Sequence, residues 1–231
     1  FMVVRFLHHA DVVLAAQRSL VPVMNGCCDR YHPLQILADL QTIQEKLGRL
    51  EGVKLVYAGV HNNVTNSLIA AALKVGMVIT VVSPEMNPAA LDRDLLREAE
   101  TAGAYRPADN LRSAAKDSDV VYTDTWIDME YFGDPEFAAE KERRVEQFAP
   151  YRLSVATLAG VDTLIMHCLP AHRGYEIDGE LLDDPAAPLA GQGRTRRSRE
   201  PREDPPHQPH VTVSDPQAEP SPDGFRQRQQ Q

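Results

Sequence analysis

The chain has 231 residues, enough for one large domain or two small ones. Its net charge of −9 and pI of about 5.4 argue against a nucleic-acid partner, which would require a basic face. No stretch approaches the roughly 18 consecutive apolar residues of a membrane helix, and no signal peptide is visible. The three cysteines make a poor disulfide framework, so we expect reduced thiols in a cytoplasmic protein with no membrane partner.

Short β-branched runs alternate with helical patterns over the first 183 residues. Asn25-Gly26 is a turn signal, and Pro33 suits a first helical turn, where a backbone N–H is not needed. In chain order we expect strand Met2 to Phe6, helix Asp11 to Ser19, strand Val21 to Met24, helix His32 to Leu50, strand Val53 to Ala58, helix Asn63 to Val75, strand Met77 to Val82, helix Ala90 to Ala102, helix Leu111 to Lys116, strand Val120 to Thr123, helix Pro135 to Gln147 and strand Asp162 to Met166.

This alternation predicts an α/β fold, a doubly wound parallel sheet with helices on both faces. From the residues alone we expect this sheet to run from Val53 to Met166. Residues 185–231 are rich in proline, arginine and glutamine and are predicted to be a disordered tail. Because Phe1 opens within a predicted strand, we expect the true start of the protein to lie upstream. Ligands of such sheets bind beyond the carboxyl ends of the strands, so polar residues there are the candidates.

Two clusters come from the first part of the chain. Arg5 lies at the end of the first strand, where the alternative is an ordinary surface arginine. His32 and Gln35 are three residues apart on one helical turn, so they point the same way. The alternative for this pair is a capping turn with solvated side chains.

Three further clusters follow later strands. Asn62-Asn63 opens a helix, either as an anion- or amide-binding terminus or as an ordinary N-cap. Asp124 ends a strand and either holds a substrate ammonium or caps a helix. Cys168 follows His167, although a lone cysteine is usually a small hydrophobe. Each signal is weak alone, but every cluster lies where a doubly wound sheet presents ligands.

The order of the motifs resembles the ornithine carbamoyltransferases, within the aspartate/ornithine transcarbamoylase family, over about residues 1–184. The resemblance rests on VPVMNGCCDRYHPLQILADLQTIQE, NNVTNS, DTW and HCLPAHRGYEI in that order. It implies a preceding α/β domain that binds carbamoyl phosphate, of which residues 1–46 would be the C-terminal remnant, and an ornithine-binding domain with the sheet over residues 47–184. It further implies a homotrimer without a cofactor that joins carbamoyl phosphate and L-ornithine into citrulline and phosphate, in arginine metabolism.

The resemblance also implies a role for each motif residue. The catalytic residues would be Arg5, His32 and Cys168, with the thiol beside the reacting amine. The Leu169–Pro170 bond would be cis, a conformation that proline tolerates. The carbamoyl group would contact Arg5, His32, Gln35 and the carbonyl of Leu169. Ornithine would contact Asn63, Asp124, Asp128, Met129 and Cys168.

Departures from the family pattern leave alternatives open. No Ser-x-Arg-Thr-Arg phosphate motif occurs, so we expect the chain as given to have little carbamoyl transfer activity. Asp128-Met129-Glu130 stands where the family reads Ser-Met-Gly, and an added acid beside a substrate carboxylate is repulsive. A diamine such as putrescine is therefore an alternative acceptor. A non-catalytic module that binds an amino acid or another subunit is a further alternative.

Overall fold

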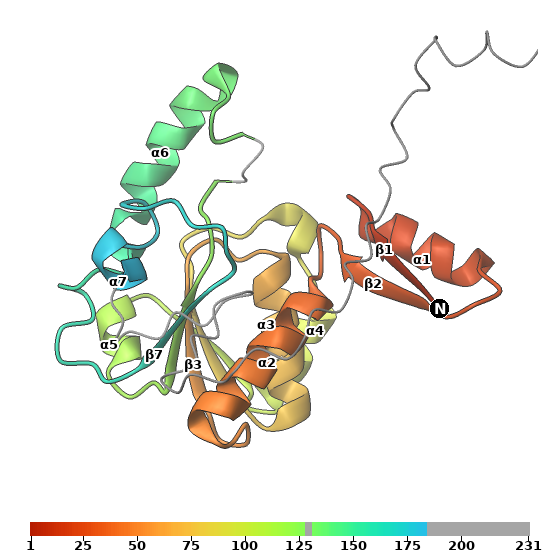
Figure 1. The fold of residues 1–231 in the computed structure, drawn as a ribbon, viewed down its shortest axis with the longest axis horizontal. Coiled ribbons are helices and arrows are strands. Elements are labelled where there is room, and N and C mark those ends of the chain that lie inside the picture. The colour runs from red at the N-terminus through yellow and green to blue at the C-terminus, as the bar shows by residue number, and fades with distance from the viewer. Residues whose placement is uncertain (128–130, 184–231) are drawn as a thin grey trace, which may run out of the picture. The chain divides into compact units, whose positions relative to one another are not determined.

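The computed structural model describes residues 1–127 and 131–183, so the tail expected over residues 185–231 lies outside the described residues. The strands are β1 (Met2–Arg5), β2 (Val23–Cys27), β3 (Lys54–Ala58), β4 (Val78–Val82), β5 (Tyr105–Ala108), β6 (Val120–Thr123) and β7 (Leu164–His167) (Figure 1). The helices are α1 (His9–Arg18), α2 (Pro33–Leu47), α3 (Asn63–Val75), α4 (Arg93–Thr101), α5 (Leu111–Ala115), α6 (Ala138–Phe148) and α7 (Gly179–Asp183). Single 3₁₀ turns cover Pro88–Ala90, Pro135–Phe137 and Ala149–Tyr151.

Five parallel strands form the main sheet, in the order β5-β4-β3-β6-β7. The chain starts in the middle with β3, adds β4 and β5 on one side, and then returns to add β6 and β7 on the other. The doubly wound parallel sheet predicted from the sequence is confirmed. Its strand order reverses between β3 and β6, and ligands of such sheets bind outside the carboxyl ends of the strands at that point.

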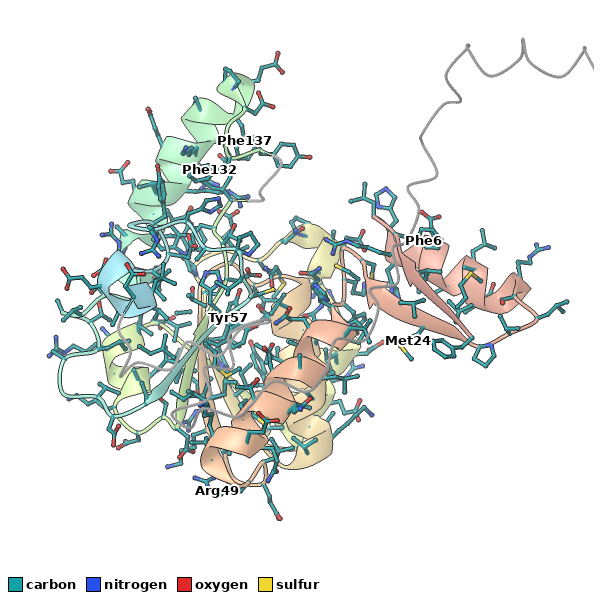
Figure 2. The ribbon with its side chains drawn as sticks, viewed as in Figure 1. Phe6, Met24, Arg49, Tyr57, Phe132 and Phe137 are labelled. Carbon is teal, nitrogen blue, oxygen red and sulfur yellow. The ribbon has the colours of Figure 1, made fainter. Side chains whose placement is uncertain are left out.

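The side chains of successive residues in each strand point to opposite faces of the sheet. On β3, Leu55 and Tyr57 pack with α2, α3 and α4, while Val56 and Ala58 pack with α5 and α7. Tyr57, labelled in Figure 2, is fully buried. Because both faces are covered, the strands read as nearly continuous apolar runs. The predicted helices on both faces are therefore confirmed.

The short sheet of β1 and β2 corrects one expectation. Asn25-Gly26 was predicted as a turn, but both residues lie within β2, which pairs in parallel with β1. A Cβ atom at Gly26 would lie 3.0 Å from the carbonyl oxygen of Val4. The glycine therefore permits a close approach of the two backbones rather than a reversal of the chain.

One strand of the main sheet had no sequence signal. β5 has the sequence Tyr-Arg-Pro-Ala and is half exposed, so it lacks the apolar run that marks the other strands. Pro107 cannot donate to a neighbouring strand, and such a residue is tolerated because β5 lies at the edge of the sheet. In the described ranges no helix is long and apolar enough to cross a membrane.

Candidate active site

The pairing of β6 with β7 brings Asp124 beside Cys168. Thr123 is the register partner of His167, and the backbone N–H of Cys168 donates to the carbonyl of Thr123 at 3.3 Å. Asp124 and Cys168 therefore come directly after the adjacent strands β6 and β7, at the carboxyl edge of the sheet. Burial raises the pKa of the Cys168 thiol strongly, and the nearby carboxylate of Asp124 raises it further. A neutral thiol suits contact with an amine better than nucleophilic attack.

Asn62 joins the carboxylate of Asp124 to the start of α3. Its side-chain oxygen caps the helix by accepting from the backbone N–H groups of Val64 and Thr65, at 3.0 and 3.2 Å. Its Nδ2 donates to Oδ2 of Asp124 at 2.8 Å. Burial raises the pKa of Asp124, whereas the nearby His167 and the bond from Asn62 lower it. Asp124 is thus a buried carboxylate held by the side chain of Asn62, just before α3, and by the backbone N–H of Thr125, which donates to its Oδ1 at 2.8 Å.

Asn63 faces the N-terminal part of the chain instead of capping the helix. Its Nδ2 donates to the carbonyl of Cys28 at 2.7 Å and lies 3.6 Å from Sγ of Cys27. The amide nitrogen is therefore occupied, and only the side-chain oxygen remains available to a ligand. Sequence reasoning gave the two cysteines no role. Their place became visible only from the contact with Asn63, which no local pattern encodes.

His32 and Gln35 occupy the first turn of α2, as the spacing predicted. The backbone N–H of His32 donates to Oγ of Ser67 at 2.7 Å, which ties α2 to α3. Burial lowers the pKa of His32, and the charge of Arg5 lowers it further, so the imidazole is neutral at pH 7. Nδ1 of His32 is buried and has no protein partner among the described residues. Gln35 is only 3% exposed and donates to Asp39, so its side chain is held by the protein rather than solvated.

The charge of Arg5 acts on residues of both the HPLQ motif, through His32, and the HCLP motif, through Cys168. It ends β1, is exposed, and its register partner is Cys27. Its positive charge lowers the pKa of His32, of Cys27 and of Cys168, although burial dominates at all three groups. The charge of Arg5 therefore reaches residues of both motifs, which is the ground on which it is kept as a candidate site residue.

A second buried cluster lies behind Asp124. Nε2 of His167 is 3.2 Å from Oε1 of Glu176, and both side chains are fully buried. The same oxygen accepts from the backbone N–H of His172, whose ring stacks on Phe132 at 3.7 Å between centroids. The partner of His167 could not be found from the sequence, because Glu176 lies nine residues away across an irregular loop. In the sequence, Glu176 stands out only as the single acidic residue of the segment GYEI.

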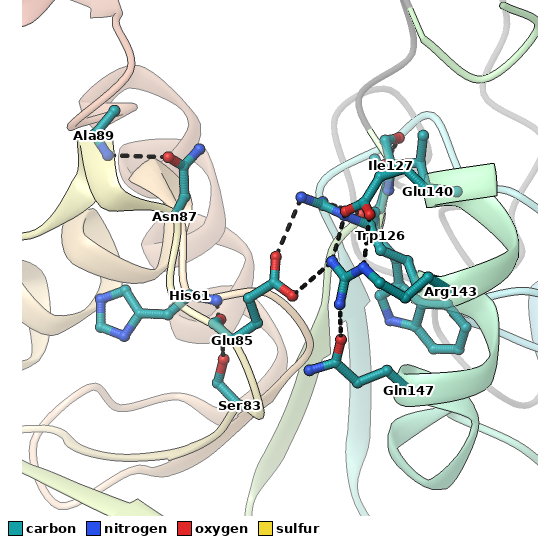
Figure 3. Close-up of polar contacts among 12 residues, drawn as sticks. His61, Ser83, Glu85, Asn87, Ala89, Trp126, Ile127, Glu140, Arg143 and Gln147 are labelled. Atoms are coloured by element: carbon teal, nitrogen blue, oxygen red, sulfur yellow. Dashed lines mark hydrogen bonds and ion pairs between the residues drawn. The ribbon is translucent and has the colours of Figure 1, made fainter. Parts of the chain in front are cut away.

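An ion network on α6 includes an arginine that binds the carbonyl of Trp126, two residues after Asp124 (Figure 3). Glu85, in the loop after β4, pairs with Arg143 at 3.0 Å and with Arg144 at 3.2 Å. Arg144 also donates to the carbonyl of Trp126 at 2.8 Å. Helix α6 thereby connects the loops that follow β4 and β6. We call Glu85, Glu140, Arg143 and Arg144 the α6 ion network.

The remaining expected site residues are Asp128, Met129 and Leu169. Asp128 and Met129 lie outside the described residues. Leu169 is 36% exposed and precedes a cis bond to Pro170, the conformation that the resemblance implied. In residues 1–127 and 131–183, no three His, Cys, Asp or Glu side chains are arranged to hold a metal ion. A surface hollow beside α5, lined in part by Asn110 and Tyr151, contains none of the candidate residues.

Comparison with protein families gives two adjacent matches. Residues 51–198 match the model described as aspartate/ornithine carbamoyltransferase, Asp/Orn binding domain. Residues 1–45 match the carbamoyl-P binding domain of the same name. The chain belongs to the aspartate/ornithine carbamoyltransferase family.

Individual relatives agree with this assignment. The chain is 39% identical over 203 residues to an ornithine carbamoyltransferase of Caldicellulosiruptor saccharolyticus, and 42% identical over 199 residues to one of Methanospirillum hungatei. Each match covers 84% of this chain and 63% of the relative, so the chain spans less than two thirds of these proteins. The solved ornithine carbamoyltransferase of Pyrococcus furiosus has a TM-score of 0.71 at 36% identity, covering 81% of this chain and 59% of that one.

Proposed function

We propose that the protein transfers the carbamoyl group of carbamoyl phosphate to the side-chain amine of L-ornithine, giving citrulline and phosphate. The observation that carries the proposal is the convergence of separate motifs. Asp124 and Cys168 are neighbours at the carboxyl edge, and the charge of Arg5 acts on both Cys168 and His32. Relatives that are 39–42% identical bear the name ornithine carbamoyltransferase.

The proposed reaction is a direct displacement at the carbamoyl carbon. The neutral amine of ornithine forms the new C–N bond, the C–O bond to phosphate breaks, and the proton that the amine loses leaves on the phosphate as hydrogen phosphate. Negative charge grows on the carbamoyl oxygen, where the guanidinium of Arg5 and a donor nitrogen of His32 would stabilise it. Removing one such donor typically costs about 3–4 kcal/mol of transition-state stabilisation. The scheme needs no cofactor.

The amine side of the site would be assembled around Asp124 and Cys168. The buried carboxylate would attract the ammonium end of the substrate, and the neutral thiol would border the reacting amine. Asn63 would contribute its side-chain oxygen, because its nitrogen is bound to the carbonyl of Cys28. We also assign Asp128 and Met129 to ornithine, and Gln35 and the Leu169 carbonyl to the carbamoyl group. A homotrimer, a cytoplasmic location and domain limits at residues 46 and 184 belong to the same proposal.

Two alternatives follow from specific sequence features. The acids Asp128 and Glu130 favour an acceptor without a carboxylate, such as putrescine. The absence of a Ser-x-Arg-Thr-Arg motif from the 231 residues favours a module that binds an amino acid without turnover.

One assay separates the three functions. The purified chain is supplied with carbamoyl phosphate and either L-ornithine or putrescine, and both carbamoylated products are measured by mass spectrometry. The proposal predicts citrulline in excess of carbamoylputrescine, at less than about 1 per second because the 231 residues contain no Ser-x-Arg-Thr-Arg motif. Product from putrescine alone would establish the diamine function. No product from either amine, with measurable binding of L-ornithine, would establish the binding module.

A further inference from the structure

A buried carboxyl group adjoins Gln35, one turn along α2. Asp39 is 2% exposed and accepts two hydrogen bonds. Its Oδ1 accepts from Nε2 of Gln35 at 3.1 Å, and its Oδ2 accepts from the hydroxyl of Tyr122 at 2.8 Å. Tyr122 is fully buried in β6, two residues before Asp124. A chain of hydrogen bonds therefore runs from the sheet to Gln35.

The ionised carboxylate leaves Gln35 only one orientation. A carboxylate only accepts hydrogen bonds, so the Gln35 amide must present its nitrogen to Asp39. The side-chain oxygen then lies on the opposite edge of the amide. Among the described residues no donor reaches that oxygen, so it stays free to accept from a ligand. Without Asp39 the amide could turn over and present two N–H donors instead.

We propose that Asp39 is a specificity-determining residue, which holds Gln35 as an acceptor and thereby selects a phosphate donor that carries an NH₂ group. The inference rests on the proposed function, in which Gln35 contacts the carbamoyl group. A carbamoyl group bears an NH₂ where an acetyl group of nearly the same shape bears a methyl. Only the NH₂ can donate to the oxygen of Gln35, so the orientation of one amide discriminates between the two groups.

Two substitutions test the orientation without changing the shape of the site. In Asp39→Asn, the hydroxyl of Tyr122 still donates to the remaining oxygen. The new amide nitrogen then faces Gln35, whose oxygen must turn to accept. Gln35 now presents N–H groups to the ligand and repels an NH₂. Adding Gln35→Glu restores an acceptor on the ligand side, because a carboxylate accepts from both sides.

The experiment measures a ratio of affinities by calorimetry on the full 231-residue chain. The probes are phosphonoacetamide and 2-oxopropylphosphonate, which differ only in NH₂ against CH₃. Measurements at pH 8.5 keep Asp39 ionised, since burial raises its pKa to about 7. Gln41 donates to Glu45 on the same helix at 2.9 Å with the same spacing but in an exposed position, so Glu45→Gln is the matched control.

We expect the parent and Glu45→Gln to bind the amide about tenfold more tightly, the equivalent of one hydrogen bond. The preference should vanish in Asp39→Asn and return in Gln35→Glu/Asp39→Asn. The added negative charge of the double variant weakens the binding of both probes alike, so the ratio of their two affinities remains the readout. A ratio unchanged by Asp39→Asn overturns the proposal, as does a double variant that folds but stays unselective.

A second readout separates this inference from the proposed function. The side-chain amide of Gln35 is followed by ¹⁵N NMR in the parent and in Asp39→Asn, with thermal melts to verify folding. If Asp39 orients Gln35, the amide resonances shift markedly in Asp39→Asn and not in Glu45→Gln. A parent that binds neither probe refutes carbamoyl recognition while this shift still supports the control of Gln35 by Asp39. Unshifted resonances overturn that control.

Discussion

The carboxyl group of Asp39 should make the stability of the fold depend on pH. Burial raises the pKa of Asp39 from 3.8 to about 7, while hydrogen bonds from Tyr122 and Gln35 lower it and the charge of Asp124 raises it. Between these two pKa values the folded chain holds a proton that the unfolded chain has released. The stability contributed by the protonated group is therefore complete below about pH 4 and is lost as pH rises through about 7.

The size of this effect follows from the shift. One pKa unit corresponds to about 1.4 kcal/mol, and roughly two of the units lie between pH 5 and pH 7. Asp39 should thus reduce the free energy of unfolding by about 3 kcal/mol between pH 5 and pH 8. Asp39→Asn has no proton to lose and should lack this component. Other titrating groups affect parent and variant equally, so the difference between the two isolates Asp39.

Urea unfolding of both proteins at several values between pH 5 and pH 8 measures this difference. The curve of the parent should fall relative to that of Asp39→Asn by about 3 kcal/mol, with most of the change below pH 7. Glu45→Gln, on the exposed face of the same helix, should run parallel to the parent. Parallel curves for parent and Asp39→Asn, to within about 1 kcal/mol, would contradict a buried carboxyl that titrates near neutrality.

Three further predictions concern other parts of the site. Arg144→Ala should cost about 1.5–3 kcal/mol and expose Trp126 to acrylamide quenching, because its N–H to the Trp126 carbonyl is lost. Arg143→Ala removes a neighbour with no such bond and should leave quenching unchanged. Cys168→Ser should keep the fold but lower citrulline formation and amine affinity, and a variant equal to the parent would reduce the thiol to packing. His32→Ala should lower the transfer rate roughly a hundred- to a thousandfold, and a smaller loss would remove His32 from charge stabilisation.

The sheet was readable from the sequence because its strands are buried on both faces. Runs such as Val120 to Thr123 mark such strands. Ligands of doubly wound sheets bind beyond the carboxyl ends of the strands, so the polar residues that follow these runs are the site candidates. Asp124 and Cys168 could therefore be placed at one edge of the sheet from the sequence alone. β5 could not be found, because an edge strand tolerates Arg106 and Pro107.

The supporting contacts were beyond sequence reasoning for a different reason. Asp39 meets Tyr122 across 83 residues, and Asn63 meets Cys28 across 35. Such pairs depend on how α2 and α3 pack on the sheet, and no periodic pattern specifies side-chain partners at that range. The sequence marks Asp39 only as a polar position of a helix, because its burial depends on how α2 packs on the sheet.

Binding of L-ornithine tests the central claim that Asp124 and Cys168 mark an amine site. Trp126 is the only tryptophan of the chain, is 1% exposed and follows Asp124 by two residues, so its fluorescence reports on the site. The titration is done with phosphonoacetamide present, for the parent, for Asp124→Asn and for Asp94→Asn on the exposed face of α4. The parent and Asp94→Asn should bind saturably, and Asp124→Asn should bind at least about tenfold more weakly, the loss of a charged hydrogen bond. Equal affinity for all three proteins, or no binding by the parent, would contradict the assignment of the carboxyl edge as the ornithine site.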